Sequence, residues 1–115
     1  MPQGLNKVIL IGIIGNEPEM RYAPSGKSAT TFSIIVDREW KDQENISHSH
    51  TESFSVLCWD DMAEKAKNDL RVEMRVYVEG FIQTRQWIDD QGNKKKAIEV
   101  IAEHLIRLDK QEEIN

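Results

Sequence analysis

Hydrophobic and polar positions alternate with a period of two along much of this chain, most clearly between residues 28 and 37. The even positions of this segment are Thr30, Phe32, Ile34 and Val36, and small or polar side chains fill most of the positions between them. Because successive side chains of a strand point to opposite faces of a sheet, the pattern predicts a strand whose even positions face a core.

Four further regions have strand character and are bounded by Gly, Pro, Asn or Asp. They are residues 5–14, 51–59, 75–88 with Gly80 inside, and 95–108, with a short additional segment at 20–23. Gly12 and Gly15 predict a bulge or a strong bend in the first region. Residues 24–27, with the sequence Pro-Ser-Gly-Lys, predict a turn before the strand at 28–37.

One segment lacks the strand pattern. Residues 39–49 are polar and charged, and only Trp40 and Ile46 are large and apolar among them. This composition predicts a long mobile loop of the kind that often carries function.

A single helix is predicted over residues 60–67, where the apolar period changes from two to that of a helix. We expect Asp60 or Asp61 at its N-cap, with Glu64 completing a capping box. The helix then falls between the third and fourth of five strands. That order predicts an all-β protein with the OB-fold, a five-stranded Greek-key barrel with one short helix between strands 3 and 4.

At 115 residues and 13.3 kDa the chain is most simply one domain, which we place at residues 1–108, followed by a short tail at 109–115. Neither a bilayer-spanning run nor a signal peptide is visible, so we expect no membrane association. The one cysteine, Cys58, cannot form an internal disulfide, and its apolar neighbours predict a small core side chain.

The formal net charge of −5 argues against binding of nucleic acid through a global positive field. Basic residues exceed acidic ones only between residues 71 and 96. That segment combines Arg85 with Trp87, and an earlier strand combines Arg21 with Tyr22. A flat aromatic beside a cation on an exposed strand is typical of a platform for unpaired bases, which predicts a local binding surface for single strands.

Three blocks of sequence, in order, carry a family resemblance: Leu5–Gly12, Pro18–Tyr22, and Val76–Gly80 running on to Arg85–Trp87. With these blocks the chain resembles the DNA-binding domain of bacterial-type single-stranded DNA-binding proteins over residues 4–108. The resemblance implies a homotetramer that binds and protects single-stranded DNA without sequence preference in replication, recombination and repair. It also implies a cytoplasmic, nucleoid-associated protein with no cofactor. The sequence itself does not separate a dimer from a tetramer.

The resemblance places the base-stacking aromatics of the family at Trp40, Trp59 and Trp87. Phe54 is a further candidate, because Ser53 stands where the family usually has another aromatic. A shift of one residue along a strand would move that side chain to the opposite face.

Six basic residues are candidates for contacts with phosphates along the bound strand. They are Lys7, Arg21, Lys41, Arg71, Arg85 and Lys95. At Gln3, Asp61 and Val72 the chain departs from the Arg or Lys that the family commonly offers. Because each lost phosphate contact reduces the salt dependence of binding, we expect modest affinity with a shallow salt slope.

Family members usually continue through a flexible linker to an acidic tip that recruits replication and repair proteins. Here the last strand is followed only by residues 109–115, in which Glu112, Glu113 and Ile114 are at most a vestige of such a tip. Recruitment of partner proteins by a tail is therefore in doubt.

Two alternatives stay open at this level. The chain could be a protein-interaction module of the same fold, such as an accessory primosome-type protein, with weak DNA binding. A small nuclease is a more distant alternative, since no nucleophile with an evident base appears. His48 and His50 could share one side of an extended segment, but the four firmly spaced ligands of a zinc site are not evident, and we predict no metal and no catalytic residue.

Overall fold

Six strands and one helix make up residues 3–108, the part of the chain that this computed structural model describes. The elements are β1 (Val8–Ile14), β2 (Glu19–Tyr22), β3 (Ser28–Lys41), β4 (Ser47–Trp59), α1 (Asp60–Asp69), β5 (Arg75–Ile88) and β6 (Lys94–Arg107). The tail at 109–115, with Glu112, Glu113 and Ile114, lies outside the described residues.

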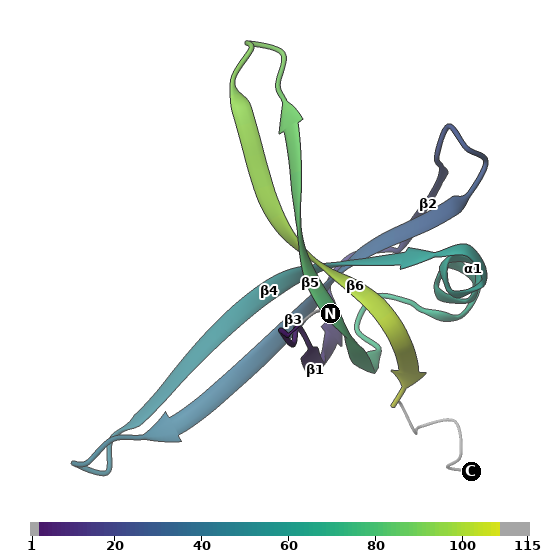
Figure 1. The fold of residues 1–115 in the computed structure, drawn as a ribbon. Helices are drawn as coiled ribbons and strands as arrows, with labels where there is room; N and C mark the ends of the chain where they lie inside the picture. The colour runs from purple at the N-terminus through teal and green to yellow at the C-terminus, as the bar shows by residue number, and fades with distance from the viewer. Residues whose placement is uncertain (1–2, 109–115) are drawn as a thin grey trace, which may run out of the picture.

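The strands form one sheet in the order β1-β5-β6-β4-β3-β2, and a further pairing of β1 with β3 closes five of them into a barrel. β2 adds to the outer edge of β3. All pairings are antiparallel except that of β4 with β6. The predicted five-stranded barrel with one helix between its third and fourth strands is confirmed (Figure 1).

β1 pairs with two different strands because it bends. Its residues Val8–Ile13 pair with β5, and Ile13 and Ile14 pair with β3. At the bend a Cβ atom on Gly12 would lie 2.3 Å from the carbonyl oxygen of Ile35, so only glycine allows the two backbones to approach this closely. The prediction of a strong bend near this glycine is confirmed.

The core follows the predicted alternation of β3, since Thr30, Phe32 and Ile34 are buried and the odd positions between them are less so. Thr30 donates a hydrogen bond from Oγ1 to the carbonyl oxygen of Ala63 at 2.7 Å, which ties α1 to the barrel. Cys58 is fully buried as predicted, and burial raises its pKa to about 12.

The predicted mobile loop at residues 39–49 is wrong. β3 continues to Lys41 and β4 begins at Ser47, so this segment is the end of a long β-hairpin with its turn at 42–46. Beyond Asp37 the hairpin leaves the barrel and neither of its faces is buried, which explains why no apolar alternation marks it. Figure 1 shows this β3–β4 hairpin and the β5–β6 hairpin projecting from the barrel in different directions.

The start of α1 also differs from the prediction. Trp59 is the N-cap and makes no side-chain hydrogen bond, so neither the expected cap at Asp60 or Asp61 nor the capping box with Glu64 is formed. Asp60 has a φ of 56°, a conformation that asparagine and aspartate tolerate better than most residues. The two aspartates lie in the first turn, where their charge stabilises the positive end of the helix dipole. The helix runs to Asp69, beyond the predicted end at residue 67.

β5 is one continuous strand through Gly80, but its register with β6 shifts there. Glu79 pairs with His104 and Gly80 with Ala102, so Glu103 is an extra residue on β6. Even positions of β6 face the core before this point and Leu105 faces it afterwards. The irregularity therefore reverses which residues of β6 point outward.

Candidate nucleic-acid interface

The strand registers place one continuous outward face across β2, β3, β4, β6 and β5. Residues directly opposite each other in a ladder share a face of the sheet. Along this face Arg21 pairs with Ala29, Ala29 with Trp59, and Trp87 with Lys95. A groove in its centre is lined by Glu19, Arg21, Ala29, Thr31, Ser55, Leu57, Trp59, Arg85 and Glu99. We call this surface the nucleic-acid face.

All three tryptophans are accessible, with exposed fractions of 41% for Trp40, 36% for Trp59 and 39% for Trp87. A cation lies over each ring: Arg38 is 4.7 Å from the centre of Trp40, Lys27 is 5.4 Å from Trp59, and Arg85 is 4.4 Å from Trp87. Each contact combines an aromatic surface with a positive charge, which is the chemistry that binds a stacked base and its phosphate.

Trp40 and Trp87 lie in equivalent places on the two long hairpins. The sequence Arg-x-Trp-x-Asp occurs at residues 38–42 and again at 85–89, each time at the end of a strand. In both turns the aspartate Oδ1 accepts two backbone N–H groups: Asp42 those of Glu44 and Ile46 at 2.9 and 3.0 Å, and Asp89 those of Gln91 and Asn93, both at 2.9 Å. The same short motif therefore builds both hairpin ends.

The two turn aspartates have pKa values below the ordinary range. The pKa of Asp42 is lowered first by its hydrogen bond with His48, and that of Asp89 first by the backbone N–H of Asn93. Both carboxylates are therefore ionised at neutral pH and keep accepting the backbone hydrogen bonds that shape the turns.

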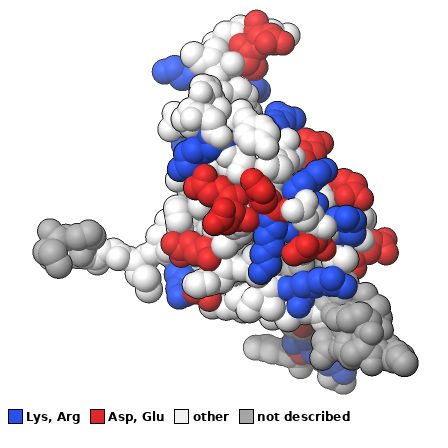
Figure 2. All heavy atoms as spheres, turned by 90° about the vertical axis from the view of Figure 1, so that its right-hand side faces the viewer, with Lys and Arg blue, Asp and Glu red and all other residues white. Residues whose placement is uncertain are grey.

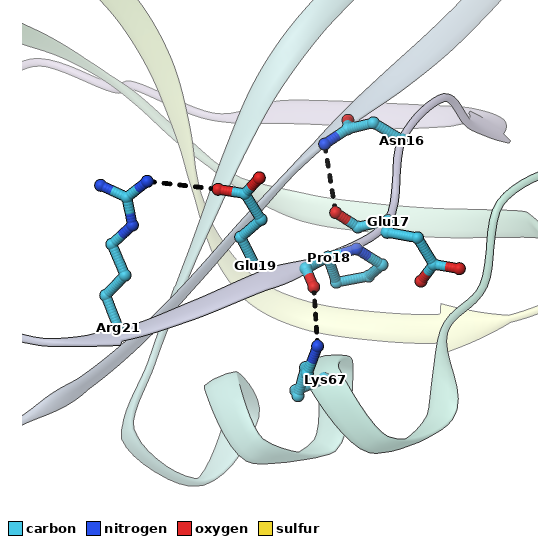
Figure 3. A network of polar contacts seen from close by, with 6 residues as sticks. All are labelled: Asn16, Glu17, Pro18, Glu19, Arg21 and Lys67. Atoms are coloured by element: carbon cyan, nitrogen blue, oxygen red, sulfur yellow. Dashed lines mark hydrogen bonds and ion pairs between the residues drawn. The ribbon is translucent and has the colours of Figure 1, made fainter.

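Most of the candidate phosphate contacts are already paired with carboxylates. Arg21 lies 3.3 Å from Glu19, as Figure 3 shows, and Arg85 Nε lies 3.0 Å from Glu99, whose side chain is only 7% exposed. Lys27 pairs with Asp60 at 3.7 Å, Lys95 with Asp89 at 3.9 Å and Lys7 with Glu79 at 2.9 Å. On the side of the molecule seen in Figure 2, basic and acidic side chains are interspersed rather than gathered by sign.

Trp40 lies off the nucleic-acid face. It occupies an even position of β3, as Ile34 does, so it is on the opposite side of the β3–β4 hairpin from Ser55, and it is exposed there because the hairpin has left the barrel.

Three further predicted residues are placed on other surfaces. Phe54 pairs with Ile34 on the inward side of β4 and packs against the core, while Ser53 points outward in its place. Arg71 donates to the carbonyl oxygens of Leu70 and Lys67 at the end of α1, at 2.8 and 3.4 Å.

Lys7 is the third. It pairs with Glu79, whose outward neighbours in the β1–β5–β6 ladder are Ile9 and His104. The hydrogen bond between Lys7 and Glu79 raises the pKa of Lys7 and lowers that of Glu79. Lys7 therefore belongs to a different outward surface from Arg21 and Arg85.

Sequence reasoning missed Arg38, Lys27 and His48. Arg38 and Lys27 lie over tryptophan rings, and His48 stacks on Trp40 with the ring centres 5.5 Å apart and the planes at 19°. The repeated Arg-x-Trp-x-Asp motif is a sequence signal for Arg38, but four of the five residues of its first copy fall in the segment predicted as a loop, residues 39–49.

Within residues 3–108 there is no group of three or more His, Cys, Asp or Glu side chains that could hold a metal ion. Instead His48 Nε2 lies 2.8 Å from Asp42 and His50 Nε2 lies 2.8 Å from Glu52, two separate exposed pairs. None of the described helices is long and apolar enough to cross a membrane.

The chain matches known proteins in both sequence and structure. The model of the "Single-strand binding protein family" matches residues 5–108. "Single-stranded DNA-binding protein 1" of Chlorobaculum tepidum is 38% identical over 102 residues, which cover 88% of this chain and 63% of that protein. This chain therefore spans less than two thirds of the length of that relative.

A solved structure, "Plasmodium falciparum SSB complex with ssDNA", superposes with a TM-score of 0.85 at 31% identity. The match covers 95% of this chain and 99% of that one. It confirms the predicted OB-fold.

Proposed function

Because the chain belongs to the single-strand binding protein family, we propose that it binds single-stranded DNA without sequence preference and protects it during replication, recombination and repair. The observation that carries this proposal is the set of three exposed tryptophans, each with a cation over its ring. Stacking accepts any base, because every base has a π face. Residues 1–108 would act as the binding domain.

We assign base stacking to Trp40, Trp59 and Trp87. We assign phosphate contacts to the basic residues near these rings: Arg21, Arg38, Lys41, Arg85, Lys95 and, beside Trp59, Lys27. Phe54, Arg71 and Lys7 are left out of this set, since the first packs against the core and the other two are held on other surfaces.

A fluorescence titration tests the function. Adding an unstructured poly-thymidine oligonucleotide of several tens of residues should quench the tryptophan emission in a saturable way at low salt. The quenching should be reduced in Trp40→Ala and in Trp87→Ala, because each variant loses one stacking platform worth roughly 1–3 kcal/mol per base. Absence of quenching from the folded protein would instead favour the interaction module.

The paired cations support the expectation of modest affinity. A phosphate can only recruit Arg21 or Arg85 by competing with Glu19 or Glu99. Binding should therefore release fewer counterions than the number of basic residues suggests.

We further propose that the protein acts as a homo-oligomer, with a tetramer as the family expectation. An aliphatic face, made of Ile9, Ile11, Tyr77 and Ile106, lies on the outside of β1, β5 and β6. Its three isoleucines are about half exposed, at 53%, 48% and 53%. Aliphatic side chains gathered on one outward sheet face are typical of protein contacts, so sedimentation equilibrium should show a mass above that of one 13.3 kDa chain.

The protein would act passively, as an occupant of the strand and not as an enzyme. Incubation of end-labelled single-stranded DNA with the protein and Mg²⁺ should leave the DNA uncut, and cleavage would contradict this assignment. The place of action would be the cytoplasm, at the nucleoid, where chromosomal single strands arise.

A further inference from the structure

The two long hairpins differ at one equivalent position. The sixth residue after the turn aspartate is His48 in the β3–β4 hairpin and Lys95 in the β5–β6 hairpin. Each is the direct cross-strand partner of the tryptophan, since His48 pairs with Trp40 and Lys95 with Trp87. Each also faces the same acidic group, with 2.8 Å from His48 Nε2 to Asp42 Oδ2 and 3.9 Å from Lys95 Nζ to Asp89 Oδ2.

The surroundings of His48 are charged on every side. Asp42 lies in the turn, and Arg38 and His50 lie on the same face of the hairpin, where they pair with each other across the strands. His50 is held by Glu52 at 2.8 Å. Glu39 and Lys41 line the same cavity as Trp40 and His48.

The difference in side chain has a chemical consequence. A lysine carries its charge throughout the physiological pH range, whereas an imidazole ordinarily gains its charge between about pH 8 and pH 5. An imidazolium ring stacked beside a bound base would attract the adjacent phosphate, as the ammonium group of a lysine would throughout this pH range. The neutral ring offers only its aromatic surface.

We propose that His48 is a DNA-contacting residue whose protonation strengthens binding at the β3–β4 hairpin, as the proton-dependent counterpart of Lys95. This inference rests on the proposed function. Binding of single-stranded DNA would then be coupled to uptake of a proton by His48 at the β3–β4 hairpin, and to no proton uptake at the β5–β6 hairpin.

The test is a set of poly-thymidine titrations at about pH 8 and about pH 5.5. For the unmodified protein we expect affinity to rise roughly threefold to fivefold at the lower pH, with the salt slope steeper by about 0.7. His48→Lys should bind poly-thymidine with the same affinity at the higher pH as at the lower one. The reciprocal variant Lys95→His should acquire a second pH-dependent step.

His50→Gln is the matched control, because it removes a neighbouring exposed histidine that lies off the tryptophan. It should keep the pH dependence. Persistence of that dependence in His48→Lys, or its loss in His50→Gln, would overturn the assignment to His48. A pH-independent affinity of the unmodified protein with normal quenching would overturn this inference alone, while absence of binding at both pH values would overturn the proposed function with it.

Discussion

The nucleic-acid face and the aliphatic face are both outward surfaces of the same barrel, but they differ in chemistry. The first exposes tryptophans beneath cations around the largely buried carboxylate of Glu99, and the second exposes isoleucines and one tyrosine. Aromatic rings with charges suit a ligand that is flat and anionic, whereas aliphatic side chains suit another protein surface. The difference shows that exposure alone does not define a site; the type of exposed side chain does.

A single irregularity allows β5 and β6 to serve both faces. Before the register shift the outward residues of β6 are Lys95, Ala97 and Glu99, and after it they are His104 and Ile106. Without the extra residue Glu103, the strand could not present outward side chains to both surfaces while keeping an uninterrupted core.

Gly80→Ala should break both faces at once and have the largest effect. A Cβ atom there would lie 1.8 Å from the carbonyl oxygen of Ile101, so the two backbones would have to move apart. We expect a loss of roughly 3 kcal/mol or more in the free energy of unfolding, measured by denaturant titration. Gly4→Ala is the control, because nothing lies within 4 Å of its Cβ position. Equal stability of the two variants would contradict the role given to the shift.

Ile11→Glu should weaken contacts between subunits through the aliphatic face and leave the nucleic-acid face unchanged. A charge placed at a buried contact between subunits remains unpaired, so association should weaken by about 30-fold or more. Sedimentation at several concentrations would measure it. Val72→Glu, at an exposed aliphatic residue outside this face, should leave the mass unchanged. An unaltered mass for Ile11→Glu would show that subunits meet elsewhere.

The barrel and the strands of the β5–β6 hairpin were predictable from the sequence, and the end of the β3–β4 hairpin was not. Residues 28–37 alternate because one of their sides is buried, and that burial is what a hydrophobic pattern records. From Asp37 to Lys41 both sides are exposed, so the same strand continues with no pattern to mark it. Its geometry depends instead on the hydrogen bonds of Asp42, which a single aspartate in a polar run does not reveal.

The site was predicted in the same uneven way. Trp40, Trp59 and Trp87 were proposed as stacking residues because the family resemblance gives their positions, and the structure shows that they are exposed. The contacts of Arg38 and Lys27 with two of these rings were not predicted, because a cation over a ring requires knowledge of which side chains are adjacent. Predicting which cations pair with carboxylates also requires knowing which strands are adjacent. Glu99 faces Arg85 from 14 residues away along the chain.

Trp59→Ala and Phe54→Ala should separate binding from stability on the two sides of β4. Trp59 is exposed, so its replacement should weaken DNA binding by about 2 kcal/mol with little change in the free energy of unfolding. The phenylalanine packs against the core and should cost about 2 kcal/mol in the free energy of unfolding with little change in affinity per folded molecule. Oligonucleotide titration and denaturant titration of both variants give the comparison. A large loss of DNA affinity in Phe54→Ala would mean that Phe54 contributes to DNA binding.

Glu19→Gln should strengthen DNA binding at the nucleic-acid face, and this is the smallest of the expected effects. Arg21 lies 3.3 Å from this carboxylate, and both side chains are largely exposed, so removing the charge frees the guanidinium for a phosphate at little cost in stability. We expect affinity at low salt to rise about twofold to threefold, and the slope of log affinity against log salt to become steeper by about 0.7. Glu17→Gln removes a nearby acidic charge that does not pair with Arg21 in the structure (Figure 3) and measures the effect of net charge alone. Equal gains in the two variants would mean that Arg21 reaches the phosphates no better when its partner is removed.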